Sequence, residues 1–365
     1  MRIIFYLHHP AQFHLFKNII KKTQLDNEVL VIATKKDILL NLLDDEKIDY
    51  VNILPEGRNN NLLSIALGLL KQDVRLWRIC RKFKPDLLVG TSTEITHIGK
   101  LMGIKSLFFI EDDIDVVPIL NYLAHPFADR IITPVVCKLG KWEKKGVKYH
   151  GYQKLSYLHP NVFQPDYQIV QKYNLKEKYF ILRLSNLGAH HDVNAKGISE
   201  DVLDKIIKKL RVKGQVLISS EGFLDEKYSE YKLKIDPLDI HHILSYCSLF
   251  IGDSQSMAVE SAILGTPNIR VSSFVNRISV LEELEHNYNL TFGIKPDNEI
   301  GLLEKIDEIV SNDNNEIIYK QRKQKLLSEK INVNDFILWY ITNFPKSDLE
   351  FKSKSDFQNK FIQND

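Results

Sequence analysis

The sequence has few of the features that mark secreted, metal-binding or membrane-spanning proteins. Its 365 residues include only three cysteines, Cys80, Cys137 and Cys247, which are widely spaced and form no Cys-x-x-Cys pair. This pattern argues against a disulfide framework and against a thiolate metal site, and it favours a reducing, cytoplasmic setting. No apolar run reaches the roughly 18 residues of a membrane-spanning helix, so none is predicted.

An excess of charge of one sign is missing as well. The 49 Lys and Arg residues and 47 Asp and Glu residues leave a net charge of +2, so we expect no nucleic-acid partner. The first apolar run, Ile3–Leu7, is too short for the core of a signal peptide and predicts a buried strand instead. The basic stretch "KNIIKK" at 17–22 is compatible with peripheral contact to an acidic membrane, but a solvated helix face is the simpler interpretation.

Short β-rich runs alternate with helical patterns in the first half of the chain. The predicted strands are Ile3–Leu7, Glu28–Ala33, Asp49–Ile53, Leu87–Gly90, Ser106–Ile110 and Arg130–Thr133. The predicted helices between them are Phe13–Lys22, Lys36–Glu46, Leu62–Lys82 and Glu94–Met102. Strand and helix at this spacing predict βαβ units and a parallel sheet.

A second series of the same kind follows an aromatic and Pro-containing segment, "GYQKLSYLHPNVFQPD". Its predicted elements are Tyr179–Leu184, Ile198–Leu210, Gln215–Ser219, Ile240–Ser245, Leu249–Gly252, Ser256–Leu264, Asn268–Val271 and a helix around Gly301–Ser311. We therefore predict domains at 1–155 and 156–330, a core-packing helix at 331–345 and a polar, poorly ordered tail at 346–365. The predicted fold class is α/β, with two Rossmann-like domains whose parallel sheets face each other across a cleft.

The stretch "GDSQSMAVESA" carries the strongest candidate site. Asp253 and Ser254 follow a predicted buried strand and are good helix N-caps, so the next helix begins close to the carboxyl edge of the sheet. Amides and dipole at such a helix start favour an anion such as a diphosphate, here through Gln255, Ser256 and Met257. Glu260 lies one helical turn beyond Ser256, where a carboxylate suits the hydroxyls of a ribose. The alternative is an ordinary capped helix with a surface glutamate.

This arrangement resembles the nucleotide-sugar site of GT-B glycosyltransferases and hydrolysing UDP-N-acetylglucosamine 2-epimerases. The epimerases carry Asp-Ser-Gly-Gly-x-x-Glu-Glu here, so Asp253, Ser254 and Glu260 match while Gln255 and Ser256 replace the two glycines. A closer resemblance, over nearly the whole chain, is to the family named domain of unknown function 354, which is GT-B-like and occurs in surface-polysaccharide loci. It rests on "HPAQFHLFKNII", "GYQKLSYLHP", "GDSQSMAVESAILGTPNIR", "RISVLEELE" and "FILWYITNFP".

Histidines and carboxylates after two first-domain strands are candidates for catalysis. In GT-B enzymes the loop between the first strand and the first helix often carries the base that activates the acceptor. The corresponding stretch here is "HHPAQFHLF", and His14 is our first candidate for this base and His9 the second. Glu111 in "FFIEDDIDVVP" follows another strand and is a third candidate for a base. A structural role is the alternative for each, and neither group has the spacing of a metal site.

Further candidates for contact with the nucleotide sugar lie in the second domain. A guanidinium or imidazolium suits the charge of a diphosphate leaving group. These candidates are Arg183, His190, His191, Glu221 and Arg277. A polar surface loop is the alternative for the histidine pair, and the His-Arg-Arg-Glu-Asn run of the hydrolysing epimerases is missing here.

The resemblance implies a GT-B type transferase that moves a sugar from a UDP-linked donor to a glycan or lipid-linked acceptor. It implies no separate cofactor and no metal ion, and a place in the cytoplasm or peripheral to the inner face of the membrane. A hydrolysing 2-epimerase and a non-catalytic nucleotide-sugar-binding protein are the alternatives. The oligomeric state stays open.

Overall fold

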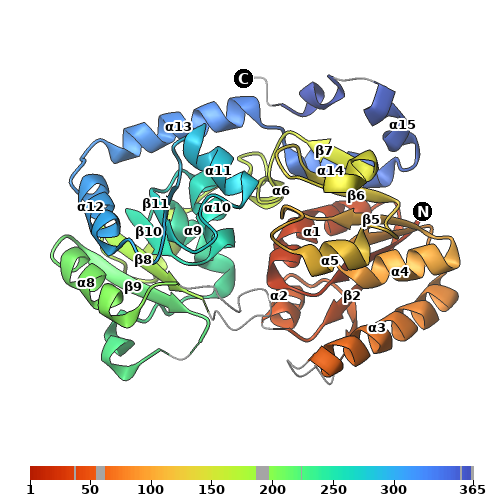
Figure 1. Ribbon diagram of the computed structural model, residues 1–365, viewed down its shortest axis with the longest axis horizontal. Coiled ribbons are helices and arrows are strands. Elements are labelled where there is room, and N and C mark those ends of the chain that lie inside the picture. Colours follow the sequence, from red (N-terminus) through yellow and green to blue (C-terminus); the bar gives the residue numbers. More distant parts are fainter. Residues whose placement is uncertain (37, 55–61, 186–196, 223, 354–355, 363–365) are drawn as a thin grey trace. The chain divides into compact units, whose positions relative to one another are not determined.

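The chain forms two compact units in a computed structural model (Figure 1). Unit 1 comprises Met1–Val162 and Ile331–Asp365, and unit 2 comprises Phe163–Lys330. The structure describes all residues except 37, 55–61, 186–196, 223, 354–355 and 363–365. For 62–67 it describes the backbone but not the side chains. The first unit therefore extends to Val162 rather than to the predicted residue 155, and it also includes the C-terminal residues.

Unit 1 is built on a seven-stranded parallel sheet with the order β3-β2-β1-β4-β5-β6-β7. The six predicted strands are all present, with ends that differ by at most one residue. The strands are β1 (Arg2–Leu7), β2 (Glu28–Thr34), β3 (Tyr50–Leu54), β4 (Leu87–Gly90), β5 (Lys105–Phe109), β6 (Arg130–Pro134) and β7 (Gly146–Tyr149). Strands β2 and β3 are added to one side of β1, and β4 to β7 to its other side, so β1 and β4 are neighbours in the sheet.

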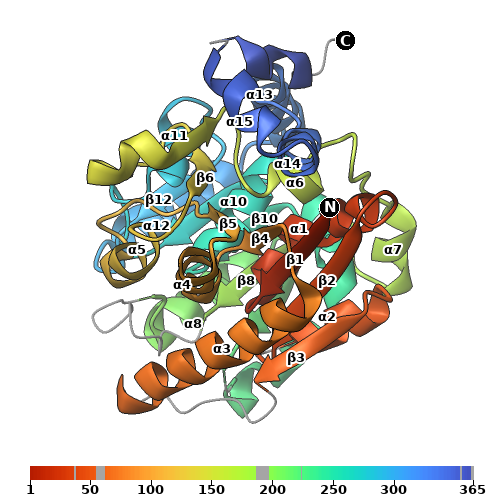
Figure 2. The same cartoon turned by 90° about the vertical axis from the view of Figure 1, so that its right-hand side faces the viewer.

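Helices cover both faces of this sheet. The N-terminal part of unit 1 contains α1 (Pro10–Thr23), α2 (Leu39–Asp45), α3 (Leu62–Phe83), α4 (Thr93–Met102), α5 (Pro118–Ala124), the 3₁₀ helix η1 (Gly140–Lys145) and α6 (Leu155–Leu158). Ile4 and Tyr6 of β1 pack with residues of α3 and α4, whereas Phe5 contacts Phe16 of α1. Because side chains alternate along a strand, α1 lies on the face opposite to α3 and α4 (Figure 2).

Unit 2 repeats the architecture with a five-stranded parallel sheet in the order β12-β11-β10-β8-β9. Its strands are β8 (Tyr179–Leu184), β9 (Gln215–Ser220), β10 (Leu249–Gly252), β11 (Asn268–Val271) and β12 (Phe292–Ile294). Its helices are α7 (Tyr167–Lys172), α8 (Glu200–Leu210), η3 (Glu226–Tyr231), η4 (Pro237–Asp239), α9 (Ile240–Ser245), α10 (Gln255–Leu264), α11 (Ser279–His286), α12 (Glu299–Val310) and α13 (Asn315–Glu329). Two parallel-sheet α/β units of this kind bear out the predicted fold class.

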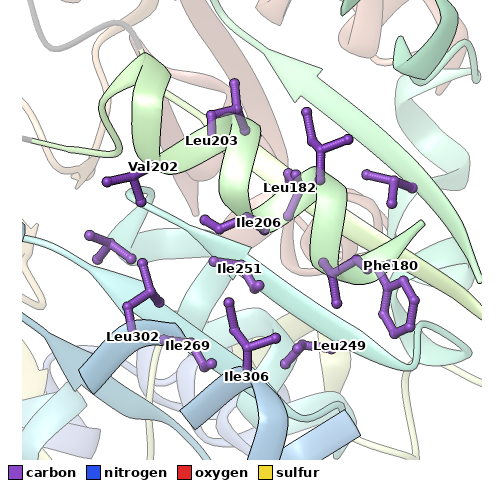
Figure 3. Packing of buried hydrophobic residues seen from close by; sticks show 14 of the residues in the cluster. Phe180, Leu182, Val202, Leu203, Ile206, Leu249, Ile251, Ile269, Leu302 and Ile306 are labelled. Atoms are coloured by element: carbon purple, nitrogen blue, oxygen red, sulfur yellow. The ribbon is translucent and has the colours of Figure 1, made fainter. Parts of the chain in front are cut away.

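One face of the unit 2 sheet is covered by α8 and α12. Leu182, Leu249, Ile251 and Ile269 project from the strands onto Ile206 and other apolar residues of these helices (Figure 3). Burial of such side chains contributes roughly 1.5–3 kcal/mol each. This packing holds the strands in register and so fixes the positions of the loops that leave their carboxyl ends.

The described residues after 332 are largely helical, so for them the expectation of a poorly ordered tail is wrong. They form α14 (Val333–Thr342), α15 (Lys346–Ser353) and η5 (Phe357–Phe361), and Phe336 packs against Tyr149 of β7. The side-chain amide of Gln358 accepts a hydrogen bond from the amide of His150 (2.8 Å) and donates one to the carbonyl of Lys148 (2.9 Å). Edge strands expose unpaired backbone groups, and this amide covers part of the β7 edge.

Among the described helices, none is long and apolar enough to cross a membrane.

Candidate functional site

The candidate site of unit 2 lies at the carboxyl ends of β8 and β10. The chain runs from β8 to β9 on one side, and β10, β11 and β12 extend the sheet on the other side. Loops therefore diverge where β8 and β10 end, and open α/β sheets bind ligands at such a switch point. Asp253 and Ser254 follow β10 directly, as the sequence predicts.

Asp253 connects the loops that follow the two strands. Its Oδ1 accepts a hydrogen bond from the amide of Ser185 at 2.7 Å. Burial raises the pKa of Asp253, and the hydrogen bonds from Ser185 act in the opposite direction. Gly197, where the chain returns toward α8, approaches so closely that a Cβ there would lie 2.3 Å from Oδ2 of Asp253. Asp253 is thus a buried side chain that contacts the described residues on both sides of the β8–α8 connection.

The helix α10 begins directly after Asp253. Ser254 is its N-cap, and Oγ of Ser254 accepts a long hydrogen bond of 3.4 Å from the amide of Met257. The side-chain amide of Gln255 donates to the carbonyl of Asp253 at 3.1 Å. Helix geometry leaves the first amides, which include those of Gln255 and Ser256, without carbonyl partners inside the helix. The helix start is therefore suited to an anion.

Glu260 is not a solvated surface glutamate. Only 6% of the residue is exposed, and its neighbours from Ala258 to Leu264 are buried as well. Oε1 of Glu260 lies 3.6 Å from Nε2 of His241 on α9. Burying a carboxylate costs free energy unless it has polar partners, and the imidazole of His241 is one such partner. A carboxylate can accept several hydrogen bonds, and the proximity of His241 is compatible with contacts to a ligand hydroxyl.

Arg183 lies at the end of β8, beside the same switch point. Its Nη1 donates to Oγ of Ser219 at 2.6 Å, and its Nη2 forms a short ion pair with Glu221. Nε of Arg183 is buried and has no hydrogen-bond partner among the described residues. The structure therefore brings two predicted site residues, Arg183 and Glu221, into direct contact.

Arg277 is the one other predicted residue of unit 2 that the structure describes. Arg277 lies on the exposed turn after β11, where its guanidinium stacks over the ring of Phe274 at 5.2 Å. His190 and His191 lie outside the described residues.

The histidines of unit 1 are held at the start of α1. His9 is the N-cap of this helix, and its Nδ1 accepts a hydrogen bond from the amide of Ala11 at 3.1 Å. His14 lies in the second turn, and its ring is 5.3 Å from the ring of Tyr157. The capping bond makes Nδ1 of His9 an acceptor, so its proton is on Nε2.

Glu111 is tied into the fold by both of its carboxylate oxygens. Oε1 accepts from the amide of Gln153 at 2.5 Å, and Oε2 forms a short ion pair with Lys154. These bonds fasten the loop after β5 to the turn before α6. They give Glu111 a structural role, which is the alternative that the sequence left open.

A polar group after β4 was missed by our sequence analysis. In the sheet, Gly90 at the end of β4 pairs with Tyr6 of β1, so Ser92 follows β4 as His8 follows β1. Ser92 is the N-cap of α4 but makes no capping hydrogen bond with its side chain, and Glu94 in the first turn is buried. Burial raises the pKa of Glu94. The rule that singled out Asp253, a polar residue directly after a buried strand, applies equally to "VGTSTE".

No metal site is evident in the described part of the chain. It contains no group of three or more His, Cys, Asp or Glu side chains arranged to hold a metal ion. The three cysteines are buried and unbridged. Burial raises the pKa of Cys80 and Cys247 to about 12, so both thiols are protonated at neutral pH.

Comparison with known families places this architecture. The model of the family described as "Protein of unknown function (DUF354)" matches residues 2–343. The chain belongs to this family. DUF354 membership covers both units and agrees with the resemblance found in the sequence motifs, and the family description assigns no reaction.

Individual relatives are more distant. The UDP-N-acetylglucosamine--N-acetylmuramyl-(pentapeptide) pyrophosphoryl-undecaprenol N-acetylglucosamine transferase of Pediococcus pentosaceus is 22% identical over 270 residues, which cover 70% of this chain and 73% of the transferase. The structure of S. aureus MnaA with UDP superposes with a TM-score of 0.68 at 14% identity and covers 97% of this chain and 98% of MnaA. The UDP-GlcNAc 2-epimerase from Methanocaldococcus jannaschii gives a TM-score of 0.64 at 13% identity, covering 86% of this chain and 94% of the epimerase. These likenesses establish the GT-B-like fold of the DUF354 chain.

Proposed function

We propose that the protein is a glycosyltransferase that uses a nucleotide sugar, UDP-linked, to build a surface polysaccharide or glycoconjugate. The observation that carries the proposal is the start of α10 at the switch point of unit 2, with the buried Glu260 one turn beyond it. Helix amides for a diphosphate and a carboxylate for ribose hydroxyls are the two recognition elements that a nucleotide diphosphate needs. The transferase from Pediococcus pentosaceus and MnaA bound to UDP support this donor class.

In this proposal unit 2 binds the donor. The amides of Gln255 and Ser256 donate hydrogen bonds to the diphosphate. The carboxylate of Glu260 accepts hydrogen bonds from the ribose hydroxyls. Arg183, held by Ser219 and Glu221, offers positive charge beside the same strand ends. Such charge stabilises the leaving diphosphate as the glycosidic bond breaks. No separate cofactor takes part.

Unit 1 then binds the acceptor, a glycan or a lipid-linked saccharide. His14 removes the proton from the attacking hydroxyl, and the neighbouring ring of Tyr157 restricts its orientation. The polar group after β4, with Ser92 and Glu94, lies beside the end of β1 in the same sheet. It supplies neutral hydrogen-bonding groups for acceptor hydroxyls, because the raised pKa of Glu94 favours its protonated form.

The first test is binding. A panel of nucleotide sugars, UDP and free sugars is screened by thermal shift against the wild type, Glu260→Ala and the control Glu299→Ala. Glu299 is a carboxylate on α12 that pairs with Lys205 at the surface. We expect a UDP-linked ligand to stabilise the wild type and the control but not Glu260→Ala. No stabilisation at millimolar ligand contradicts the proposal.

A hydrolysing 2-epimerase is the second candidate, favoured by the likeness to the epimerase from Methanocaldococcus jannaschii. The missing His-Arg-Arg-Glu-Asn run is the reason to rank it second. Incubation with UDP-N-acetylglucosamine and no acceptor separates the two reactions. Prompt release of UDP with formation of N-acetylmannosamine identifies the epimerase, and slow hydrolysis alone supports the transferase. Binding without any turnover, with acceptors or without, identifies a non-catalytic binding protein.

A further inference from the structure

The segment Pro118–Phe127, which contains α5, has apolar side chains on its outer surface. Its sequence, "PILNYLAHPF", contains no Asp, Glu, Lys or Arg. Every residue that it exposes is apolar or aromatic, namely Pro118, Ile119, Tyr122, Leu123, Pro126 and Phe127. Ile119 is 76% exposed and Leu123 is 41% exposed. Residues three and four apart share one side of a helix, so Ile119, Tyr122 and Leu123 form a continuous outer face.

The inner side of α5 packs into the core, and of the outer residues Tyr122 and Phe127 also contact the rings of Trp142 and His97. The inner side of the segment is formed by Leu120, Ala124 and Ala128, which pack with Phe108, Trp142 and other core residues. Asn121 on the same side donates to the carbonyl of Ile114 at 3.2 Å. Ile119 and Leu123 are not part of this core cluster, and both are exposed. Exposed apolar side chains gathered on one face of a helix mark a contact surface.

The surface continues onto α4, which packs beside α5 (Figure 2). His97 of α4 joins the two helices, because its Nε2 bonds to the carbonyl of Leu123 at 3.0 Å and its ring contacts that of Phe127 at 5.3 Å. One turn further along α4, Lys100 and Leu101 are exposed. A basic residue and an apolar residue thus adjoin the outer face of α5 on this side.

Further lysines lie on the opposite border. Nζ of Lys141 in η1 lies 5.0 Å from the ring centre of Tyr122, and Lys144 is one 3₁₀ turn away and exposed. The carboxylate between them, Glu143, is turned toward Lys148 at 2.8 Å and the amide of Leu139 at 2.9 Å. Apolar side chains bordered by lysines match an anionic membrane surface, where the apolar groups enter the interface and the lysines face the headgroups.

We propose that the outer face of α5, with Lys100, Lys141 and Lys144 at its borders, docks onto the surface of an anionic lipid bilayer. A second copy of the chain fits this face less well. A two-fold interface places the same surface of both copies together, and it would bring the border lysines of both copies to one interface. The proposal does not depend on the transferase activity, because membrane docking needs neither donor nor acceptor.

The experiment measures sedimentation of the full-length protein with vesicles, without any nucleotide sugar. Vesicles of equal parts phosphatidylglycerol and phosphatidylcholine are compared with vesicles of phosphatidylcholine alone. We expect binding to the anionic vesicles that weakens as salt is added. The double variant Ile119→Ser, Leu123→Ser is expected to lower the partition coefficient by about tenfold per side chain. The control is Val212→Ser, Ile300→Ser, which changes two unit 2 residues that are at least as exposed, 77% and 73%.

The charged border is tested with Lys141→Ala, Lys144→Ala. We expect this pair to lower binding by about fivefold per lysine and to flatten the salt dependence. The control pair is Lys35→Ala, Lys36→Ala, two exposed lysines elsewhere in unit 1. All changed side chains are exposed, and circular dichroism checks that each variant is folded.

Three results overturn the proposal. The wild type fails to sediment with anionic vesicles, the serine double variant binds as well as its control, or light scattering finds a wild-type dimer that the serine double variant converts to a monomer. The last result assigns the face to a second copy of the chain.

Discussion

Nε2 of His241 lies 3.6 Å from Oε1 of Glu260, and both side chains are buried in unit 2. The contact joins α9 to α10 directly behind the helix start to which we assign the diphosphate. It gives a buried carboxylate a partner and fixes its orientation. We infer that His241 helps to position the carboxylate of the proposed ribose contact.

The first prediction concerns this pair. Removing one partner of a buried pair leaves the other without compensation, so Glu260→Gln and His241→Asn are each expected to lower the free energy of unfolding by about 2 kcal/mol. The double variant is expected to lose about 1 kcal/mol less than the sum of the two, because contacting residues couple. Urea unfolding followed by circular dichroism gives all four values.

The control for this cycle is Glu308→Gln, an exposed carboxylate of α12. Its combination with His241→Asn should be additive within a few tenths of a kcal/mol. If the His241 and Glu260 changes are additive as well, the two side chains do not support each other and the positioning role of His241 is wrong.

The second prediction concerns Gly197. A Cβ at this position would lie 2.3 Å from Oδ2 of Asp253, so Gly197→Ala must displace the Asp253 side chain. We expect at least a tenfold loss in affinity for the UDP-linked ligand, measured by calorimetric titration. The control is Gly103→Ala at the end of α4, where φ is +70° but no atom lies within 4 Å of the added Cβ.

Gly103→Ala is expected to cost about 1 kcal/mol of stability, because a left-handed residue tolerates a side chain poorly. It should leave ligand affinity unchanged. Equal affinity losses in both variants would show that the Gly197 effect is not local.

The third prediction concerns the ion pair that holds the C-terminal residues. Nε and Nη2 of Arg130 donate to the two carboxylate oxygens of Asp348, each at 2.6 Å. Burial by itself would raise the pKa of Asp348, but hydrogen bonds from Arg130, Lys352 and Tyr340 outweigh it and hold the pKa at about 2. Because this pKa lies below the ordinary value of 3.8, the stabilisation is full above about pH 4 and is lost as the pH falls toward 2.

Asp348→Asn is therefore expected to lower the free energy of unfolding by about 2 kcal/mol at pH 7 and by about 1 kcal/mol at pH 3. All three tryptophans, Trp77, Trp142 and Trp339, belong to unit 1, so their fluorescence reports on its unfolding. The exposed Glu350 of the same helix provides the control Glu350→Gln, with an expected effect near zero. A loss that does not shrink at acidic pH contradicts the assignment.

The fourth prediction concerns His125, which is buried against Trp142 and Phe108 beside α5. Burial, with a smaller contribution from the charge of Lys145, lowers the pKa of His125 to about 4. The folded state thus disfavours the protonated ring, so stability is full above the ordinary pKa of 6.5 and falls as the pH drops toward 4.

The free energy of unfolding of the wild type is expected to fall by about 2 kcal/mol between pH 7 and pH 5 because of His125. His125→Phe removes the titrating group. It should flatten this part of the pH dependence of the free energy of unfolding, measured by tryptophan fluorescence. His286→Gln, which changes an exposed histidine of α11, should leave the profile unchanged. Parallel profiles for the wild type and His125→Phe would show that another group is responsible.

Local patterns explain why most of the sheets could be predicted from the sequence. Strands such as Leu87–Gly90 and Tyr179–Leu184 are short apolar runs between polar segments. Their predicted ends are the same as those in the structure. β7 (Gly-Val-Lys-Tyr) and β12 (Phe-Gly-Ile) were missed because neither contains more than one apolar residue in succession. Their strand character comes from pairing with a neighbour, which a sequence window does not contain.

Non-local contacts explain the failures. The polar composition of the C-terminal residues predicted disorder, but Asp348 meets Arg130 across 218 positions of the chain, and Phe361 packs against Phe336. The candidate site shows the same division. Glu260 was found because its spacing from Ser256 is local, whereas its neighbour His241 depends on how α9 packs beside α10.

Part of unit 1 is formed by residues that follow all of unit 2 in the chain. Ribosomes release 1–162 first, then all of unit 2, and only afterwards the residues that form α14, α15 and η5. Until Gln358 arrives, the backbone of β7 at Lys148 and His150 lacks its final partner and remains open to other strands. A chain interrupted before Gln358 therefore leaves these two backbone groups without this side chain, at a sheet edge where another strand can pair.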